Sequence, residues 1–334
     1  MTNRRQREEI ERYRKEIESV IDKREVEVLD ELEVVYTELA VEIAEEVQKL
    51  EAQIEEAGEN YSQQIQIERL EQINKRINDK LQEIDRIQEV GIESYLTDAF
   101  KLEYGSVFYQ IETEFGINSS FSMLPERVIN AIVNTPVDGR RFSERLRGST
   151  HALKTNMNEI LVKGFATGKG AYKIAHEIAE VSGSTFGRAR NIAITESGRV
   201  TGTADQQSQQ EATEKGARLE KIWVSTLDGK TRDTHQQLDG QVRGVDEYFE
   251  IAGKQALQPH LFGDPAEDCN CRCRAVGVVN GLTPSARRDN LTTEVIDFKS
   301  YEEWYKDKEA EYGTEEWNAI LRENKYNRRR NRRR

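Results

Sequence analysis

Apolar residues recur every three or four positions through much of the first 90 residues. Gly58 and Asn60 lie in the middle of this region and are residue types that end helices and form turns. Because residues three and four apart share one face of a helix, the spacing predicts two amphipathic helices. We therefore expect a long helical hairpin or coiled coil over residues 1–91, with arms of about 30 residues that each span roughly 45 Å. Two apolar stripes define the arms: Leu29, Leu32, Val35, Leu39, Ile43, Val47, Leu50 and Ile54, and then Leu70, Ile73, Ile77, Leu81, Ile84 and Ile87.

Neither arm can bury its stripe alone. The arms must pack on each other, on later helices or on another subunit, so self-association through the N-terminal helices is one expectation. Residues 92–216 also show helical spacing, in shorter pieces separated by glycines. Pro125 suits the first turn of one helix, and Ser184 suits the N-cap of the last one. The expected helices of this middle region run from Pro125 to Ile132, Phe142 to Val162, Ala171 to Val181 and Thr185 to about Ala212.

The pattern changes after Gly216. Lys221–Ser225 and Arg274–Val279 are short apolar runs typical of strands, and the stretch between them is rich in glycine and proline. We predict a small α+β module over residues 217–282, followed by a charged and partly helical tail over residues 283–334. The expected fold class is thus mainly α with a small C-terminal α+β module.

Charge is distributed unevenly along the chain, whose net charge is -12. Residues 25–59 hold one basic residue, Lys49, against 13 acidic ones. The last seven residues hold six arginines that would attract DNA phosphates or an acidic partner surface, or act only as a solvated tail: Arg328, Arg329, Arg330, Arg332, Arg333 and Arg334. No run approaches the roughly 20 apolar residues that span a bilayer, and the charged N-terminus lacks the apolar centre of a signal peptide. We expect no membrane partner and synthesis in a cytoplasm.

The cysteines lie close together, at Cys269, Cys271 and Cys273. They are poorly placed to bridge one another, and the chain has no distant cysteine, so a disulfide framework is excluded. Two thiolates combined with one or both of the imidazoles of His235 and His260 would form a tetrahedral zinc site. The alternative is a set of buried or incidental thiols, because the spacing differs from the usual C-x2-C pattern. Structural zinc is the one cofactor that the sequence suggests.

A longer constellation surrounds these cysteines. It begins at Trp223, passes through a D-G-K-T-R-D-T-H segment and a G-D-P turn, and ends in N-C-R-C. This order resembles the C-terminal domain of phage minor head proteins, the family typified by phage Mu protein F. Cys269 lies outside that pattern. The positions that carry the resemblance are Trp223, Ser225, Asp228, Thr231, Arg232, His235, Leu238, Asp239, Gly240, Gly263, Asp264, Pro265, Asn270, Cys271, Arg272 and Cys273.

The resemblance covers about residues 185–280, including a softer match at Ile192–Arg199, in which Glu196 and Arg199 suggest an ion pair or an interdomain contact. It implies a low-copy virion protein inside the head near the portal. Such a protein acts in procapsid assembly, DNA packaging or DNA ejection. The implied partners are the portal protein, a scaffold or the major capsid protein, and the C-terminal arginines add packaged DNA as a further candidate.

Asp228, Arg232 and His235 also allow an enzymatic interpretation. Their spacing would let His235 act as a base or metal ligand with Asp228 as its partner, in a metal-dependent hydrolase or nuclease that includes the cysteines. A buried structural network explains the same residues without a substrate. The chain shows no phosphate-binding glycine loop and no Ser-His-Asp order, so we expect a binding protein and not an enzyme.

Overall fold

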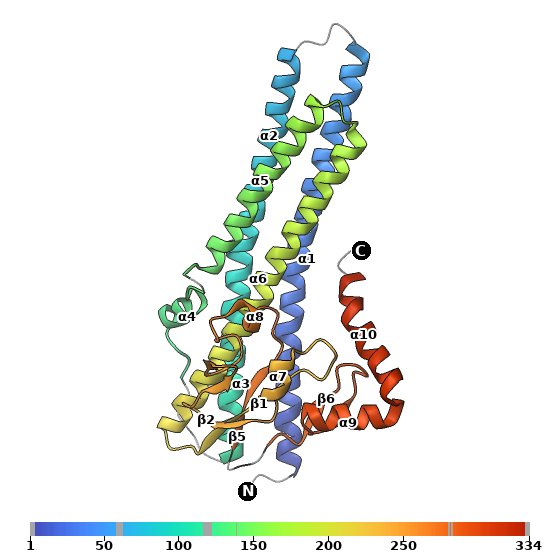
Figure 1. Ribbon diagram of the computed structural model, residues 1–334. Helices are drawn as coiled ribbons and strands as arrows, with labels where there is room; N and C mark the ends of the chain where they lie inside the picture. The colour runs from blue at the N-terminus through green and yellow to red at the C-terminus, as the bar shows by residue number, and fades with distance from the viewer. Residues whose placement is uncertain are drawn as a thin grey trace. The chain divides into compact units, whose positions relative to one another are not determined.

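The structure is a computed structural model that describes residues 4–57, 63–115, 122–137, 139–279, 281 and 283–330 (Figure 1). The chain divides into two compact units that are interleaved along the sequence. Unit 1 comprises Met1–Ile21, Thr97–Val133 and Thr195–Arg334, and unit 2 comprises Asp22–Leu96 and Asn134–Ile194. This division differs from the succession of segments that we expected, because helices that are continuous in sequence contribute residues to both units.

Unit 2 is an antiparallel helical bundle. The antiparallel direction of the helices follows from ion pairs such as Lys80 with Glu38 at 3.3 Å and Arg76 with Glu46 at 3.5 Å. The residue number of one partner rises along the bundle as that of the other falls. The Thr150 hydroxyl likewise donates to Asp85 at 2.6 Å. Four helices supply the bundle: α1 (Arg4–Ala57), α2 (Gln63–Arg86), α5 (Phe142–Ala166) and α6 (Ala171–Glu214).

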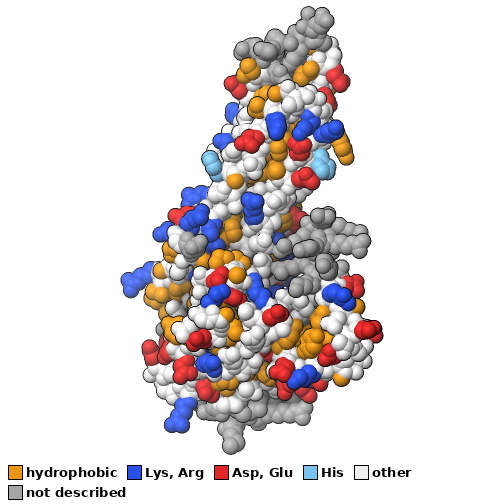
Figure 2. Space-filling model, viewed as in Figure 1, with side chains coloured by type: hydrophobic (Ala, Val, Ile, Leu, Met, Phe, Trp, Pro, Cys, Tyr) orange, Lys and Arg blue, Asp and Glu red, His pale blue; other side chains and the backbone are white. Residues whose placement is uncertain are grey.

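The two predicted stripes form the core of this unit. Leu32, Leu39 and Ile43 on α1, with Ile77 and Ile84 on α2, are fully buried. The α1 helix is longer than the expected arm, and the predicted turn at Gly58 and Asn60 lies outside the described residues. On the visible face of the bundle, acidic and basic side chains are interspersed (Figure 2). The stripes are covered within the chain itself, so they are not left open for self-association.

The second arm does not end at residue 91. A π-helical turn, Ile87–Gly91, joins α2 directly to α3 (Ile92–Phe115). Gln88 in this turn is buried and donates to the Tyr36 hydroxyl at 2.8 Å. The extra residue of a π turn shifts the helical register without breaking the helix, which the apolar pattern could not indicate.

The predicted break at Ser184 is also wrong, because α6 runs without interruption through Gly183 and Ser184. A glycine inside a helix is unfavourable by only about 1 kcal/mol relative to alanine. Burial of Ile174 and Ile178 before this point, and of Ala189 after it, outweighs that penalty.

The predicted module forms part of unit 1. Its central strand β1 (Leu219–Val224) pairs in antiparallel fashion with β2 (Val242–Gly244) and with β5 (Arg274–Val279), which matches the predicted second strand. The intervening stretch contains short elements: α7 (Asp233–Leu238), β3 (Phe249–Ile251), β4 (Lys254–Ala256) and α8 (Pro265–Asp268).

Helix α4 (Glu126–Val133) agrees with the predicted helix after Pro125. The expected ion pair is also present, because Arg199 Nε donates to Glu196 Oε2 at 2.7 Å in a buried position. The same guanidinium donates to the carbonyls of Ile132 and Val133 at 3.0 and 2.9 Å, which caps the last turn of α4.

Residues after 283 fold onto the module and do not form an extended tail. Leu227 of the module packs with Tyr301, Trp304 and Trp317 in one buried cluster. The segment contains β6 (Ala286–Arg288), β7 (Val295–Asp297), α9 (Tyr301–Tyr312) and α10 (Thr314–Arg330). The side chains of the C-terminal arginine cluster lie outside the described residues. No described helix is both long and apolar enough to cross a membrane.

Candidate metal centre

Trp223 on β1 is the centre of the module's apolar core. Its ring is fully buried and meets the rings of His235 and Phe249 edge-on, with centroids 5.6 and 5.2 Å apart. The chain returns to it after α7, where the Gly240 amide donates to the Trp223 carbonyl at 2.9 Å. Gly240 has a φ of 80°, a left-handed conformation that glycine adopts without strain. The motif residues thus begin with a packing anchor.

Asp228 fixes the loop that leads into α7. Its carboxylate receives two hydrogen bonds from Arg272, at 2.5 and 2.9 Å, and others from the amides of Lys230 and Thr231. Burial opposes its ionisation, but the hydrogen bonds and charge of Arg272 outweigh this effect and lower the Asp228 pKa. The enzymatic interpretation made Asp228 the partner of His235, whereas its carboxylate is bound to Arg272.

Arg232 and the G-D-P turn organise the segment before the cysteines. Arg232 lies at the N-cap of α7 in an extended conformation, and its guanidinium donates to the carbonyls of Glu267 and Cys269. Asp264 caps α8 by accepting from the Ala266 amide at 2.8 Å, and Pro265 occupies the first helical turn. Asn270 then turns the chain with a φ of 55°.

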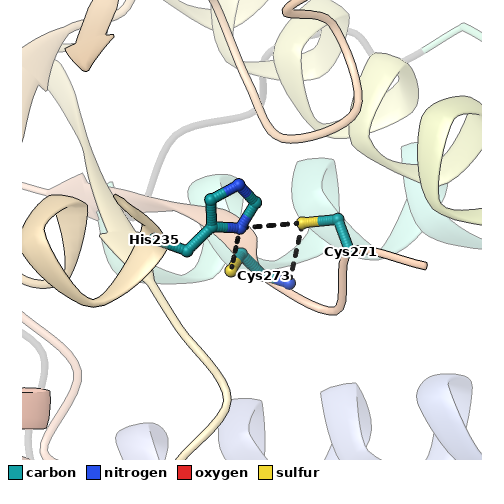
Figure 3. Close-up of side chains that lie close together, drawn as sticks. All are labelled: His235, Cys271 and Cys273. Carbon is teal, nitrogen blue, oxygen red and sulfur yellow. Dashed lines mark hydrogen bonds between the residues drawn. The ribbon is translucent and has the colours of Figure 1, made fainter. Parts of the chain in front are cut away.

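These bonds bring three candidate ligands together (Figure 3). His235 Nδ1 lies 3.5 Å from Cys271 Sγ and 3.3 Å from Cys273 Sγ. All three side chains are buried, and their ligand atoms lie within 4.8 Å of one another. His235 and Cys271 are 36 positions apart in the sequence, but α7 lies beside the segment that leads into β5, so their side chains meet.

The other two candidate ligands are elsewhere. Cys269 is exposed. His260 is buried, but its ring packs against Gly198, where an added Cβ would lie 2.2 Å from Nε2. Burial lowers the His260 pKa to about 4, so this ring is neutral at ordinary pH. The expectation that these two residues join the cluster does not hold in this structure.

Glu267 was not among the candidate residues that the sequence suggested. Its Oε2 lies 3.2 Å from His235 Nε2 and accepts from the Thr234 hydroxyl at 2.9 Å, while Oε1 accepts from Lys254 at 3.2 Å. Burial opposes ionisation of Glu267, but the Thr234 and Lys254 contacts prevail and its pKa is lowered. The sequence offered only the G-D-P turn in this region, and the folded arrangement is what brings the Glu267 carboxylate to His235.

The segment that carries the motif matches a known protein family. The model of the family described as "Phage Mu protein F like protein" matches residues 155–276, which include every motif residue from Trp223 to Cys273. This match, together with the relatives below, supports a phage minor head protein.

Relatives extend the match beyond the Mu F-like segment. Minor head protein GP7 of Bacillus phage SPP1 is 28% identical over 312 residues, covering 91% of this chain and 97% of GP7. A protein of Enterococcus faecalis named NAD(+)--arginine ADP-ribosyltransferase EFV is 36% identical over 249 residues, covering 75% of this chain. This chain spans 51% of the length of EFV. The uncharacterised YqbB of Bacillus subtilis is 27% identical over 187 residues, covering 53% of this chain and 57% of YqbB. No solved structure matches the chain.

In this Mu F-like module the pKa values of Cys271 and Cys273 are shifted in opposite directions. The contact with Cys273 and burial raise the Cys271 pKa. Burial also opposes ionisation of Cys273, but its contacts with Cys271, His235 and Ser225 outweigh that effect and lower its pKa. The buried set of one imidazole and two sulfur atoms has the composition of a ligand set for a thiophilic metal ion.

Proposed function

We propose that this protein is a minor head component that binds at the portal vertex and acts in head assembly and in DNA packaging or delivery. The observation that carries the proposal is the match to a minor head protein along 91% of this chain and 97% of that relative. Similarity to phage head proteins supports a place in the virion. Synthesis and assembly in the host cytoplasm belong to the same proposal.

Binding, and not catalysis, is the proposed mechanism. The bundle buries its apolar stripes internally and presents charged side chains, which suits a rigid surface that docks on the portal, a scaffold or the major capsid protein. The motif residues Asp228, Arg232 and Arg272 use their charged groups to hold loops of the module together. This structural use accounts for them without a substrate.

The transferase activity in the name of EFV is not part of the proposal. The aligned region covers 51% of that protein, so its name can describe a part that this chain does not match. Incubating the full chain with NAD+ and arginine-containing proteins, or with duplex DNA, checks for catalysis directly. Turnover that is lost in His235→Ala would contradict the binding mechanism.

Deletion of the gene from the phage or prophage that carries it tests the proposed function. We expect fewer DNA-filled heads and lower infectivity, with recovery when the wild-type chain is supplied in trans. Purified particles should contain the protein at low copy number. Normal infectious heads without the gene, or particles that lack the polypeptide, would overturn the proposal.

Contact with DNA is a separate part of the proposal and rests on the six C-terminal arginines. Each arginine that neutralises a phosphate releases condensed cations, so duplex binding by the full chain should weaken steeply as salt rises. Replacing all six arginines by glutamine should abolish this binding and its salt dependence. The control Lys163→Gln with Lys173→Gln, at exposed lysines of the bundle, should leave it unchanged. Equal binding by all three proteins would contradict a DNA contact at the C-terminus.

A further inference from the structure

We propose that His235, Cys271 and Cys273 hold one zinc ion, which ties α7 to the start of β5 and completes the fold of the module. The three side chains are buried, and they come from two segments, α7 and the residues that lead into β5, which hydrogen bonds such as Arg272 to Asp228 already hold side by side. The assignment commits to a smaller ligand set than the sequence suggested, because Cys269 and His260 take no part.

The distances fit a tetrahedral zinc ion. Zn–N bonds of about 2.0 Å and Zn–S bonds of about 2.3 Å place the nitrogen and sulfur ligands about 3.5 Å apart at a tetrahedral angle. The observed separations from His235 Nδ1 are 3.5 Å to Cys271 Sγ and 3.3 Å to Cys273 Sγ. An ion could therefore enter with side-chain shifts of a few tenths of an ångström, roughly the tolerance of such sites.

The surroundings also match those of a metal-bound imidazole. A histidine ligand usually gives its second ring N–H to a carboxylate, which fixes the ring orientation and makes the ligand nitrogen a stronger donor. Glu267 Oε2 lies 3.2 Å from His235 Nε2, and Thr234 and Lys254 hold that carboxylate in place. Glu267 lies at ion-pair distance from His235 Nε2 without hydrogen-bond geometry, and it is the observation, independent of the cysteines, that supports His235 as a ligand.

Charge and hydrogen bonding favour a divalent ion between two thiolates. Two thiolates neutralise the ion, and the Cys273 amide lies 3.4 Å from Cys271 Sγ as a donor to that sulfur. Soft sulfur ligands combined with imidazole select zinc over magnesium or calcium. Among the described residues these three side chains supply the ligands, because Cys269, whose carbonyl is held by Arg232, is exposed and outside the group.

The module needs such a connection. Between α7 and β5 the chain forms elements of only three or four residues, and elements of this size have little stability of their own. The ion would close the loop from His235 to Cys271 and hold its ends together. Binding free energy at such a site adds directly to the folding free energy.

Metal analysis of the full-length protein, purified without chelators, tests the assignment. We expect one zinc ion per chain in the wild type and in Cys269→Ser, and none retained in Cys271→Ser or Cys273→Ser after dialysis. Replacement by Co²⁺ should produce the sulfur-to-cobalt charge-transfer band and the visible bands of a tetrahedral site. Far-UV circular dichroism of each variant shows whether the helices remain folded.

Glu267→Gln separates a positioning role from simple packing. The variant should still bind one zinc ion, with an affinity lower by about 10- to 100-fold in competition with a chromophoric chelator. Glu250→Gln, at an exposed carboxylate bonded to Gln255, should match the wild type. A merely structural role for Glu267 would change the unfolding midpoint but leave the affinity of the folded protein unchanged.

Several results would overturn the proposal. These are a metal-free wild type that does not take up added Zn²⁺, full zinc retention in a folded Cys271→Ser variant, or a disulfide between Cys271 and Cys273 in unreduced protein. Chelation offers a test without substitution, since metal removal should change the fluorescence of Trp223, whose ring lies against His235. An absent metal would leave the head-assembly proposal standing, because that proposal rests on the family match.

Discussion

Arg287 joins the C-terminal segment to the module, and its replacement by methionine should destabilise unit 1. The guanidinium is buried and donates to both carboxylate oxygens of Asp239, at 2.9 and 3.1 Å. It also donates to the carbonyls of Lys299, at 2.8 Å, and of Ser225. One side chain thus connects the end of β1, the end of α7 and the start of α9.

The expected magnitude follows from what remains around Asp239. Removal of one partner from a buried ion pair costs about 3–5 kcal/mol. The amides of Ser225 and Tyr301 still donate to the carboxylate in the variant, at 2.5 and 2.6 Å, which favours the lower end of this range. We therefore expect a loss of about 3 kcal/mol in the free energy of unfolding.

Urea denaturation measures this loss. The tryptophans all belong to unit 1, so their fluorescence reports on that unit, while circular dichroism follows the helices of the whole chain. Arg288→Met is the matched control, because this neighbouring arginine on β6 is exposed and should change the free energy by at most about 0.5 kcal/mol. The double variant with Asp239→Asn should be less unstable than the sum of the single variants by about 1–3 kcal/mol. If Arg287→Met behaved like Arg288→Met, residues after 283 would not be held as described.

Three further predictions concern packing and pH. The His260 pKa of about 4 in the folded protein lies below the unfolded value, so the unfolded chain binds the proton first as the pH falls. The stability present above pH 6.5 should therefore fall by on the order of 3 kcal/mol as the pH drops to 4. A pH series of urea midpoints measures this loss, and His260→Asn should remove it. Gly198→Ala would place a Cβ 2.2 Å from His260 Nε2 and should lower the stability by about 1–3 kcal/mol. Gly183→Ala on the same helix meets nothing within 4 Å and should raise the stability by up to about 1 kcal/mol. Equal melting temperatures of the two variants would contradict this prediction. Leu39→Ala should cost about 2–5 kcal/mol by circular dichroism, against little change for the half-exposed Val41→Ala, and a small Leu39 effect would mean that the bundle core is not packed as described.

The helices and the two main strands could be predicted because their signals are local. The Leu32, Leu39 and Ile43 spacing defines a helical face in any context, and residues on that face are buried as expected. The Arg274–Val279 strand was found from its apolar run alone. The motif identified the family because the order of its residues is itself a property of the sequence.

The wrong predictions involved signals that tertiary packing overrides. Gly183 and Ser184 have the composition of a helix boundary, but the small local penalty is outweighed by apolar burial along α6. Trp304 and Trp317 lie in a buried cluster, yet the segment that carries them was expected to form a charged and partly helical tail. Its folding depends on contacts with Leu227 and Asp228, which lie more than 70 residues earlier in the chain.

Sequence pattern alone was therefore enough for the family resemblance and the helical character, and it named a set of candidate metal ligands. Which members of that pool meet was a matter of three-dimensional contact: His235 joins Cys271 and Cys273, Glu267 approaches the far side of the imidazole, and Cys269 stays outside. The physical reason is that a ligand set requires atoms within a few ångströms of one another. Spacing along a chain with irregular loops does not specify such distances. The hydrogen bonds of Asp228, Arg232 and Asp239 fix the loops and thereby set these distances.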